Sequence, residues 1–293
     1  MDFTIENNFL RVTVSGRGAE LVSAVKKETG EELVWQADPA VWNRHAPILF
    51  PYCGRLKNGA FTHNSVSYEG GGHGFARDMD HTLSEQGDDF VSLCLEANAL
   101  TMEKFPFAFK LVSTFRLDGC TLHHEISVHN DGDEEMPFSF GYHPGFNCPF
   151  DAQHKAEDYI LRFDVPETPT VVETGEQDGL VTGKNYTYFE SGTEIPVRDG
   201  LYDHDSVCFK NLRSSTLSLV EKDTGRRVTV GIKGFPYVLM WSAKGPIRFV
   251  CIEPWHGLPD PRAASGVWAE KPDTVHLAPG GSWQTALSME FAR

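Results

Sequence analysis

The chain contains 293 residues, of which 40% are hydrophobic and 23% are charged. This composition is typical of a globular protein and excludes a disordered, collagenous or fibrous one. The formal net charge of −15 is spread along the chain, so we expect no partnership with nucleic acid or with an anionic membrane surface.

Alternation of apolar and polar residues recurs along the whole chain and predicts β-strands. In chain order the strand-like segments are FLRVTVS, SVSYEG, FVSLCLEA, FKLVSTFRLDG, TLHHEISVHN, TLSLVEKDTG, RRVTVGIKG, YVLMWSA, IRFVCIEP and WQTALSMEF. Short helical pieces are expected near 99–104 and 261–269, and loops with edge strands are expected over 151–206. Hairpin signals between the strands favour packed antiparallel sheets, and we expect one domain over residues 1–293.

The cysteines and the N-terminal sequence indicate in which cellular compartment the protein is expected. The six cysteines stand singly, several of them in apolar segments, so free buried thiols are favoured over disulfides or a zinc site. The N-terminus lacks the basic and apolar regions of a secretion signal, and no apolar run reaches the ~18 residues that span a bilayer. We therefore expect a cytoplasmic protein.

The segment FSFGYHPGF, residues 138–146, carries the first candidate for chemistry. Alternation places His143 on the same face as Ser139 and Gly141, two small residues that are expected to leave space for a ligand. Pro144 restricts the backbone of His143 to extended conformations and so fixes the direction of its imidazole. A hydrogen-bonded core histidine is the alternative interpretation.

The segment IRFVCIEPWHG, residues 247–257, ends in a similar way. Glu253 closes a row of apolar side chains and precedes Pro254, which again restricts the backbone. Burial there is expected to raise the pKa of the Glu253 carboxyl group toward the range of a general base at neutral pH. A solvated glutamate at a strand end is the alternative.

Two loops add polar side chains that suit a ligand. Arg55, in PILFPYCGRLKNGAF, follows an aromatic-rich strand and can direct two hydrogen bonds at adjacent hydroxyl groups. His73 lies among glycines in GGGHGFAR, where neighbouring side chains leave its imidazole accessible. This glycine cluster lacks the phosphate-loop pattern GxxxxGK[ST], so we do not expect a nucleotide site.

The 12 histidines form no local metal-binding motif, because neither HxH nor HExxH occurs. His123, Glu125 and His129 share one face of a predicted strand, but the outer two lie roughly 20 Å apart and cannot hold one ion. They are better interpreted as a solvated face. We expect no metal, since any site would need ligands distant in sequence.

Taken together, these segments resemble the aldose 1-epimerase (galactose mutarotase) family, in particular its branch of LacX-like proteins. The matches run in chain order: the turn at 54–59 with Arg55, HGF at 73–75, YHPGF at 142–146, EPWHG at 253–257 and a closing strand APGGSWQTALSMEF. The resemblance implies an all-β protein, a large antiparallel β-sandwich of the galactose mutarotase-like type. It also implies a sugar bound in an open cleft across one sheet.

The resemblance assigns roles to four of these residues. Glu253 would be the general base that removes the proton from the anomeric O1 hydroxyl, and His143 would be the acid that protonates the ring oxygen O5. Arg55 and His73 would orient the sugar through its hydroxyl groups and ring oxygen. A further aspartate that holds sugar hydroxyls falls in LYDHDSVCFK, where we expect Asp205 and keep Asp203 as the alternative.

The activity implied is a mutarotase that interconverts the α and β anomers of a free aldohexose. Proton transfer suffices for this reaction, so no cofactor is expected, and the only expected partner is a small sugar. Arg77 keeps a hexose-6-phosphate mutarotase as an alternative, because arginines surround the phosphate in such enzymes. A non-catalytic sugar-binding protein and a glycoside hydrolase with a second catalytic carboxyl group are further alternatives. The sequence leaves the oligomeric state open.

Overall fold

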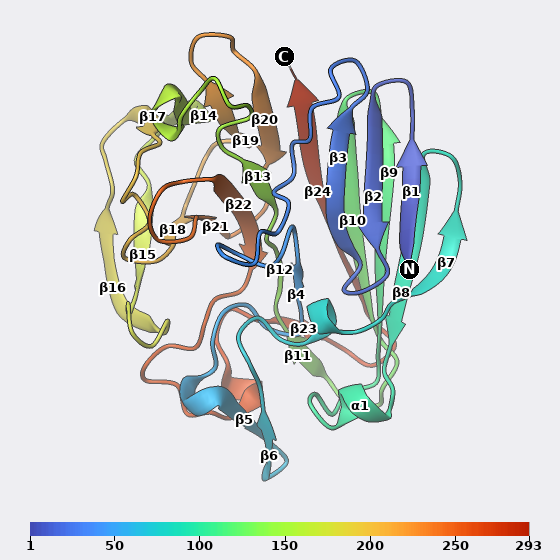
Figure 1. The fold of residues 1–293 in the computed structure, drawn as a ribbon. Coiled ribbons are helices and arrows are strands. Elements are labelled where there is room, and N and C mark those ends of the chain that lie inside the picture. Colours follow the sequence, from blue (N-terminus) through green and yellow to red (C-terminus); the bar gives the residue numbers. More distant parts are fainter. Residues whose placement is uncertain (293) are drawn as a thin grey trace.

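The computed structural model describes residues 1–292, which form an all-β protein built from antiparallel sheets (Figure 1). The expectation of a β-sandwich of the galactose mutarotase-like type is confirmed. The largest sheet has nine strands in the order β17 (Gly192–Pro196), β14 (Tyr159–Glu167), β19 (Thr216–Glu221), β20 (Arg227–Gly231), β24 (Ser282–Ala292), β10 (Thr121–Asn130), β9 (Phe109–Asp118), β8 (Phe90–Glu96) and β7 (Thr82–Gln86).

A second sheet of eight strands carries the chemistry. Its order is β16 (Val181–Thr187), β15 (Thr170–Thr174), β18 (Val207–Lys210), β21 (Tyr237–Trp241), β22 (Phe249–His256), β12 (Phe140–Tyr142) and β4 (Ile48–Leu49), while β13 (Gly145–Asn147) also pairs with β22. Seven of the eight residues of β22 are buried, so this strand is covered on both faces.

Smaller elements complete the fold. A three-stranded sheet of β1 (Asp2–Glu6), β2 (Leu10–Ser15) and β3 (Glu20–Lys26) lies over β8 to β10 (Figure 1). A hairpin joins β5 (Ala60–His63) to β6 (Val66–Glu69), and a separate two-stranded sheet pairs β11 (Met136–Phe138) with the distant β23 (Val275–Leu277). The helical elements are α1 (Ala99–Met102) and four 3-10 turns, at Lys57–Gly59, Ala76–Asp78, Ala156–Asp158 and Trp268–Glu270.

One buried apolar cluster connects these sheets. It includes Val12 of β2, Leu111 of β9, Phe209 of β18 and Ile252 of β22. The strands β9 and β10 alternate between buried and less buried residues, as a strand with one face on a core must. Among residues 1–292 no helix is both long enough and apolar enough to cross a membrane.

Several sequence expectations need correction. The segment 138–146 is broken into β11, β12 and β13, because β11 pairs with β23 in a separate sheet and Pro144 cannot donate to a ladder. The helix expected over 261–269 is reduced to the 3-10 turn Trp268–Glu270. Within 151–206, β16 and β17 are edge strands as expected, but β14 lies inside the nine-stranded sheet. The six cysteines are free, and five are buried, as expected.

Candidate functional site

A cleft of about 340 Å³ lies beside β21 and β22 and brings the predicted site residues together. Its lining includes Arg55, His73, His143, Asp205 and Glu253. These residues come from five separate segments of the chain. The volume falls in the range of about 300–1,000 Å³ that small-molecule sites occupy.

The backbone register brings His143 to Glu253. Strands β12 and β13 pair with β22 in one common register, which places His143, in the interval between them, opposite Glu253. Pro144 has no N–H group and interrupts the ladder at this point. The Trp255 indole Nε1 donates a 3.2 Å hydrogen bond to the carbonyl oxygen of Tyr142 and fixes the chain entering the interval. Side chains directly opposite on antiparallel strands are close neighbours, so this contact follows from the strand pairing.

His143 and Glu253 are both buried and touch each other. The distance from His143 Nε2 to Glu253 Oε2 is 3.2 Å, and the Glu253 side chain is only 1% exposed. Burial, followed by the negative charge of Asp205, raises the pKa of the Glu253 carboxyl group well above its usual value. Burial lowers the pKa of His143 to about 3. Both shifts favour an uncharged pair that shares one proton at neutral pH.

The space for a ligand lies elsewhere than the sequence suggested. A Cβ atom on Gly141 would lie 2.6 Å from Trp255 Cδ1, so the indole fills the space beside this glycine. Ser139 in turn packs against Gly257, where an added Cβ would lie 2.4 Å from the serine Cβ. The open side of His143 instead faces the cleft.

Two tryptophans that the sequence did not single out form walls beside His143. The Trp42 ring stacks on the imidazole with centroids 5.0 Å apart, and Trp241 meets it edge-on at 5.6 Å. Both line the cleft. Trp42 comes from a segment without strand periodicity, and Trp241 ends a strand that reads as ordinary core, so neither carried a usable sequence signal.

His73 is held in a defined tautomer. The Gly54 N–H donates to His73 Nδ1 at 3.1 Å, so in the neutral ring the proton lies on Nε2. Burial lowers the pKa of His73 well below its usual value and keeps the ring neutral. The residue has a φ of 66°, a left-handed conformation that non-glycine residues rarely adopt. The loop therefore presents the Nε2–H of His73 as a hydrogen-bond donor at the cleft, while Nδ1 is already hydrogen-bonded to Gly54.

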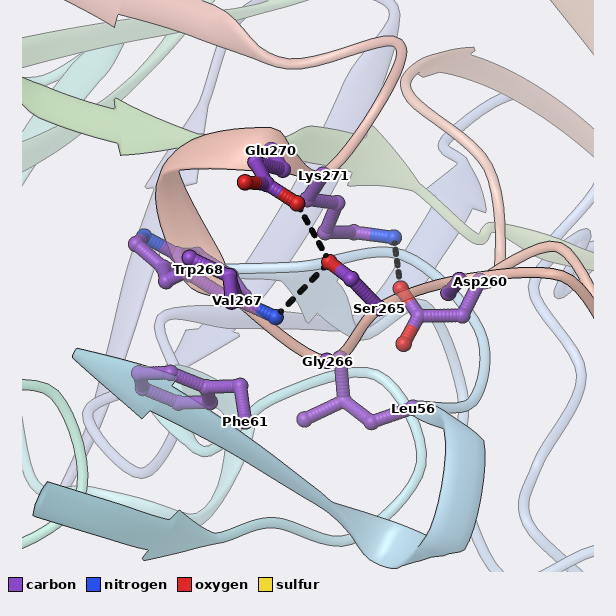
Figure 2. Close-up of a pocket in the computed structure, with 10 residues that line it drawn as sticks. Leu56, Phe61, Asp260, Ser265, Gly266, Val267, Trp268, Glu270 and Lys271 are labelled. Carbon is purple, nitrogen blue, oxygen red and sulfur yellow. Dashed lines mark hydrogen bonds and ion pairs between the residues drawn. The ribbon is translucent and has the colours of Figure 1, made fainter. Parts of the chain in front are cut away.

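A buried ion pair supports the loop that carries Arg55. Asp260 donates its N–H to the Arg55 carbonyl oxygen at 2.9 Å and accepts the Lys57 N–H on Oδ2 at 2.9 Å. Lys271 Nζ donates to Asp260 Oδ1 at 2.7 Å and to the Leu258 carbonyl oxygen at 3.0 Å. Figure 2 shows the Lys271 ammonium group directed at Asp260. The pair thus joins the Arg55 loop to the segment that follows β22.

The structure separates the two candidate aspartates. Asp205 is half-buried, lines the cleft and lies two residues before the strand β18. Its φ of 87° is again left-handed. Asp203 is exposed and is not among the described residues that line the cleft.

Arg77 adds a cation to the cleft wall. Its Nη2 donates to the Gly72 carbonyl oxygen at 2.6 Å, while its buried Nε has no hydrogen-bond partner in residues 1–292. Burial, followed by the charge of Arg44, lowers the pKa of Arg77 to about 10, so the group stays charged at neutral pH. Arg44 is tied to Asp78 by a 2.7 Å ion pair.

The chain is similar to curated and structurally solved proteins over nearly its whole length. The chain is 30% identical over 286 residues to the chromosomal protein LacX of Lactococcus lactis subsp. lactis, covering 95% of each chain. A galactose mutarotase related enzyme from Lactobacillus acidophilus is 34% identical, with a TM-score of 0.95 over 100% of this chain and 98% of the other. A galactose mutarotase-like protein from Lactobacillus casei is 33% identical, with a TM-score of 0.91 over 99% of each chain.

The family assignment rests on nearly the full length. The model of the family described as aldose 1-epimerase matches residues 1–290. This range contains all the residues that line the cleft. The resemblance seen in the sequence motifs is thereby confirmed, and the chain belongs to the aldose 1-epimerase family.

Proposed function

We propose that this protein is an aldose 1-epimerase that interconverts the α and β anomers of a free aldohexose. The contact of 3.2 Å between His143 Nε2 and Glu253 Oε2 at the base of the cleft is the main support. A sugar-binding protein without turnover has no need of an imidazole and a carboxyl group placed side by side. Their position suits proton transfer at two neighbouring oxygens.

Ring opening requires one proton to leave O1 and another to reach O5. Glu253 accepts the O1 proton as the C1=O1 bond forms, and His143 donates a proton to O5 as the C1–O5 bond breaks. Both oxygens are bonded to C1, so two groups a few ångströms apart can address them together. Rotation about C1–C2 and reclosure return both protons and invert the anomer.

The proton inventory of the pair suits this cycle. Burial favours the uncharged pair in the free protein, with the shared proton on Glu253. Transfer of that proton across the contact to His143 creates the base and the acid in one step. No redox cofactor or metal takes part in these transfers, because positioning and acid–base catalysis supply the acceleration.

Three further residues would position the sugar. Arg55 offers hydrogen-bond donors and Asp205 an acceptor for sugar hydroxyl groups, and His73 offers its Nε2–H to the ring oxygen or a hydroxyl. Trp42 and Trp241 present apolar surface to a pyranose face. Six free cysteines fit a reducing compartment, and we infer a cytoplasmic location.

Arg77 favours a second candidate, a hexose-6-phosphate mutarotase. The Arg77 side chain lines the cleft, and Arg55 lines the same cleft. Such groups bind a phosphate well, and they stand out in a chain whose net charge is −15. The chemistry at C1 would be the same for both substrates.

Polarimetry with a panel of sugars tests these proposals. Freshly dissolved α-D-glucose and α-D-galactose should approach anomeric equilibrium faster with the protein than in buffer. A faster rate with the 6-phosphates than with the free sugars would favour the second candidate. If no aldose or sugar phosphate is accelerated, while a sugar still binds in calorimetry, the protein is a binding protein and the enzymatic proposal is wrong.

A further inference from the structure

We propose that His143, Cys251 and Glu253 bind a thiophilic divalent cation such as Zn²⁺ and that this cation inhibits the enzyme. One ligand atom from each of the three residues lies within 4.8 Å of the others, and all three residues are buried. The inhibition, though not the binding, rests on the proposed function. The cation here is an inhibitor and not a cofactor.

The strand pairing places the three ligands together. Cys251 and Glu253 are two residues apart on β22, so their side chains leave the same face. His143 stands opposite Glu253 in the interval between β12 and β13. The eight-stranded sheet contains Cys251 and Glu253 and holds His143 through the two strands that flank it.

Unused polar atoms provide the second observation. In the described part of the chain His143 Nδ1 and Glu253 Oε1 are buried and have no hydrogen-bond partner. The His143 residue is 7% exposed and the Glu253 residue 1% exposed. A buried polar atom without a partner is unfavourable, and a bound cation removes part of this penalty by taking a lone pair of Glu253 Oε1.

The donor set selects the kind of metal. Nitrogen, sulfur and carboxylate oxygen together suit Zn²⁺ or Cd²⁺, whereas Mg²⁺ and Ca²⁺ prefer oxygen donors alone. On binding, the cation replaces two protons, the thiol proton of Cys251 and the proton shared by His143 and Glu253, and both leave to solvent. Three protein ligands leave a fourth position for water or a sugar hydroxyl, and both proposed catalytic side chains are then occupied by the metal.

A second cluster with similar spacing does not compete. Ligand atoms of Asp151, His154 and Glu221 also lie within 4.8 Å of one another. The Arg226 guanidinium already donates to the carboxylates of Asp151 and Glu221. This positive group competes with a metal ion for the same carboxylates, so the proposal is confined to His143, Cys251 and Glu253.

Cadmium binding tests the site without reference to activity. Wild type, Cys251→Ala and the matched control Cys208→Ala, which alters another buried cysteine in the same sheet, are titrated with Cd²⁺. The thiolate-to-cadmium absorbance in the ultraviolet and calorimetry are recorded. We expect wild type and Cys208→Ala to show the same absorbance band and the same affinity for Cd²⁺. In Cys251→Ala the band should be lost and the affinity for Cd²⁺ should fall by at least about tenfold. A band that persists unchanged in Cys251→Ala, or that is missing from wild type, overturns the proposal.

Inhibition then separates this proposal from the proposed function. Zn²⁺ should slow mutarotation by wild type. In Cys251→Ala the rate measured with Zn²⁺, divided by the rate measured without it, should stay near one. Cys251→Ser serves as the second variant if the alanine variant does not fold. A Cys251-dependent band in a protein without mutarotase activity would leave the metal site standing and refute the function. If wild type instead shows mutarotase activity that Zn²⁺ does not slow, and no cadmium band, the proposed function stands and the metal site is refuted.

Discussion

At the scale of single residues, Glu253 is the side chain on which the chemistry depends most. Replacing the carboxyl group with an amide in Glu253→Gln keeps the shape but removes the proton acceptor. We expect kcat to fall by about 10²–10⁴-fold, with an unchanged circular dichroism spectrum. His143→Asn should lose a similar factor in the same polarimetric assay. A Glu253→Gln enzyme with the wild-type rate would remove this residue from the mechanism.

Arg77 decides between the two substrate candidates. If a phosphate binds at the Arg77 guanidinium group that lines the cleft, Arg77→Met should raise KM for glucose 6-phosphate by roughly 10-fold or more, since a charged hydrogen bond contributes about 1.5–3 kcal/mol. The KM for free glucose should change little. Equal losses for both sugars would show that Arg77 supports the cleft wall rather than a phosphate.

Local sequence patterns singled out the polar residues of the cleft but not the tryptophans that form its walls. Proline after His143 and after Glu253 restricts each backbone, so those two side chains could be singled out from local sequence alone. Trp42 could not, because its position beside His143 depends on a contact between segments far apart in the chain. The open space expected beside Gly141 was wrong for the same reason, since Trp255 from β22 fills it.

At the scale of elements, the buried pair Lys271–Asp260 joins two loops around the cleft. Both side chains are at most 5% exposed. Lys271→Met leaves the Asp260 carboxylate buried without its cation, and we expect the free energy of unfolding in urea to fall by about 3–5 kcal/mol. The double variant with Asp260→Asn should recover part of this loss. Arg162→Met, which breaks an exposed pair with Glu194, serves as the control and should cost under about 1 kcal/mol.

Strand periodicity located the elements but not their interruptions. The long alternating segments over 109–119 and 121–130 appear as β9 and β10, because local pattern suffices when one face packs on a core. The break between β12 and β13 depends on which strands pair on either side of Pro144. Sheet partners are long-range choices, and short sequence windows do not contain them.

At the scale of the whole molecule, we propose that the chain unfolds as one domain. One apolar cluster extends from Phe3 to Phe291 and includes residues of both large sheets, so neither sheet keeps its core without the other. Unfolding in urea should give one transition, with the same midpoint by tryptophan fluorescence and by circular dichroism. Two separated midpoints would contradict the single domain.

Acid should weaken this fold before most carboxylates titrate. Burial lowers the pKa of six histidines, among them His81 to about 4 and His124 to about 3; the six are His45, His73, His81, His124, His143 and His256. In the unfolded chain the pKa of each histidine is about 6.5. At a pH between the folded and the unfolded pKa the unfolded state binds more protons, so stability falls as the pH drops below about 6.5. Glu253 and His154, whose pKa values are raised, act in the opposite direction.

His124 isolates one part of this acid sensitivity. Its ring stacks on Phe115 with centroids 3.8 Å apart, and its buried Nε2 has no hydrogen-bond partner among the residues described. With a folded pKa of about 3, this histidine should cost the fold about 2 kcal/mol on going from pH 7.5 to pH 5. His124→Leu cannot take up a proton, so its urea unfolding free energy should fall less than that of wild type between the two pH values. Equal losses in both proteins would show that His124 does not contribute to the acid sensitivity.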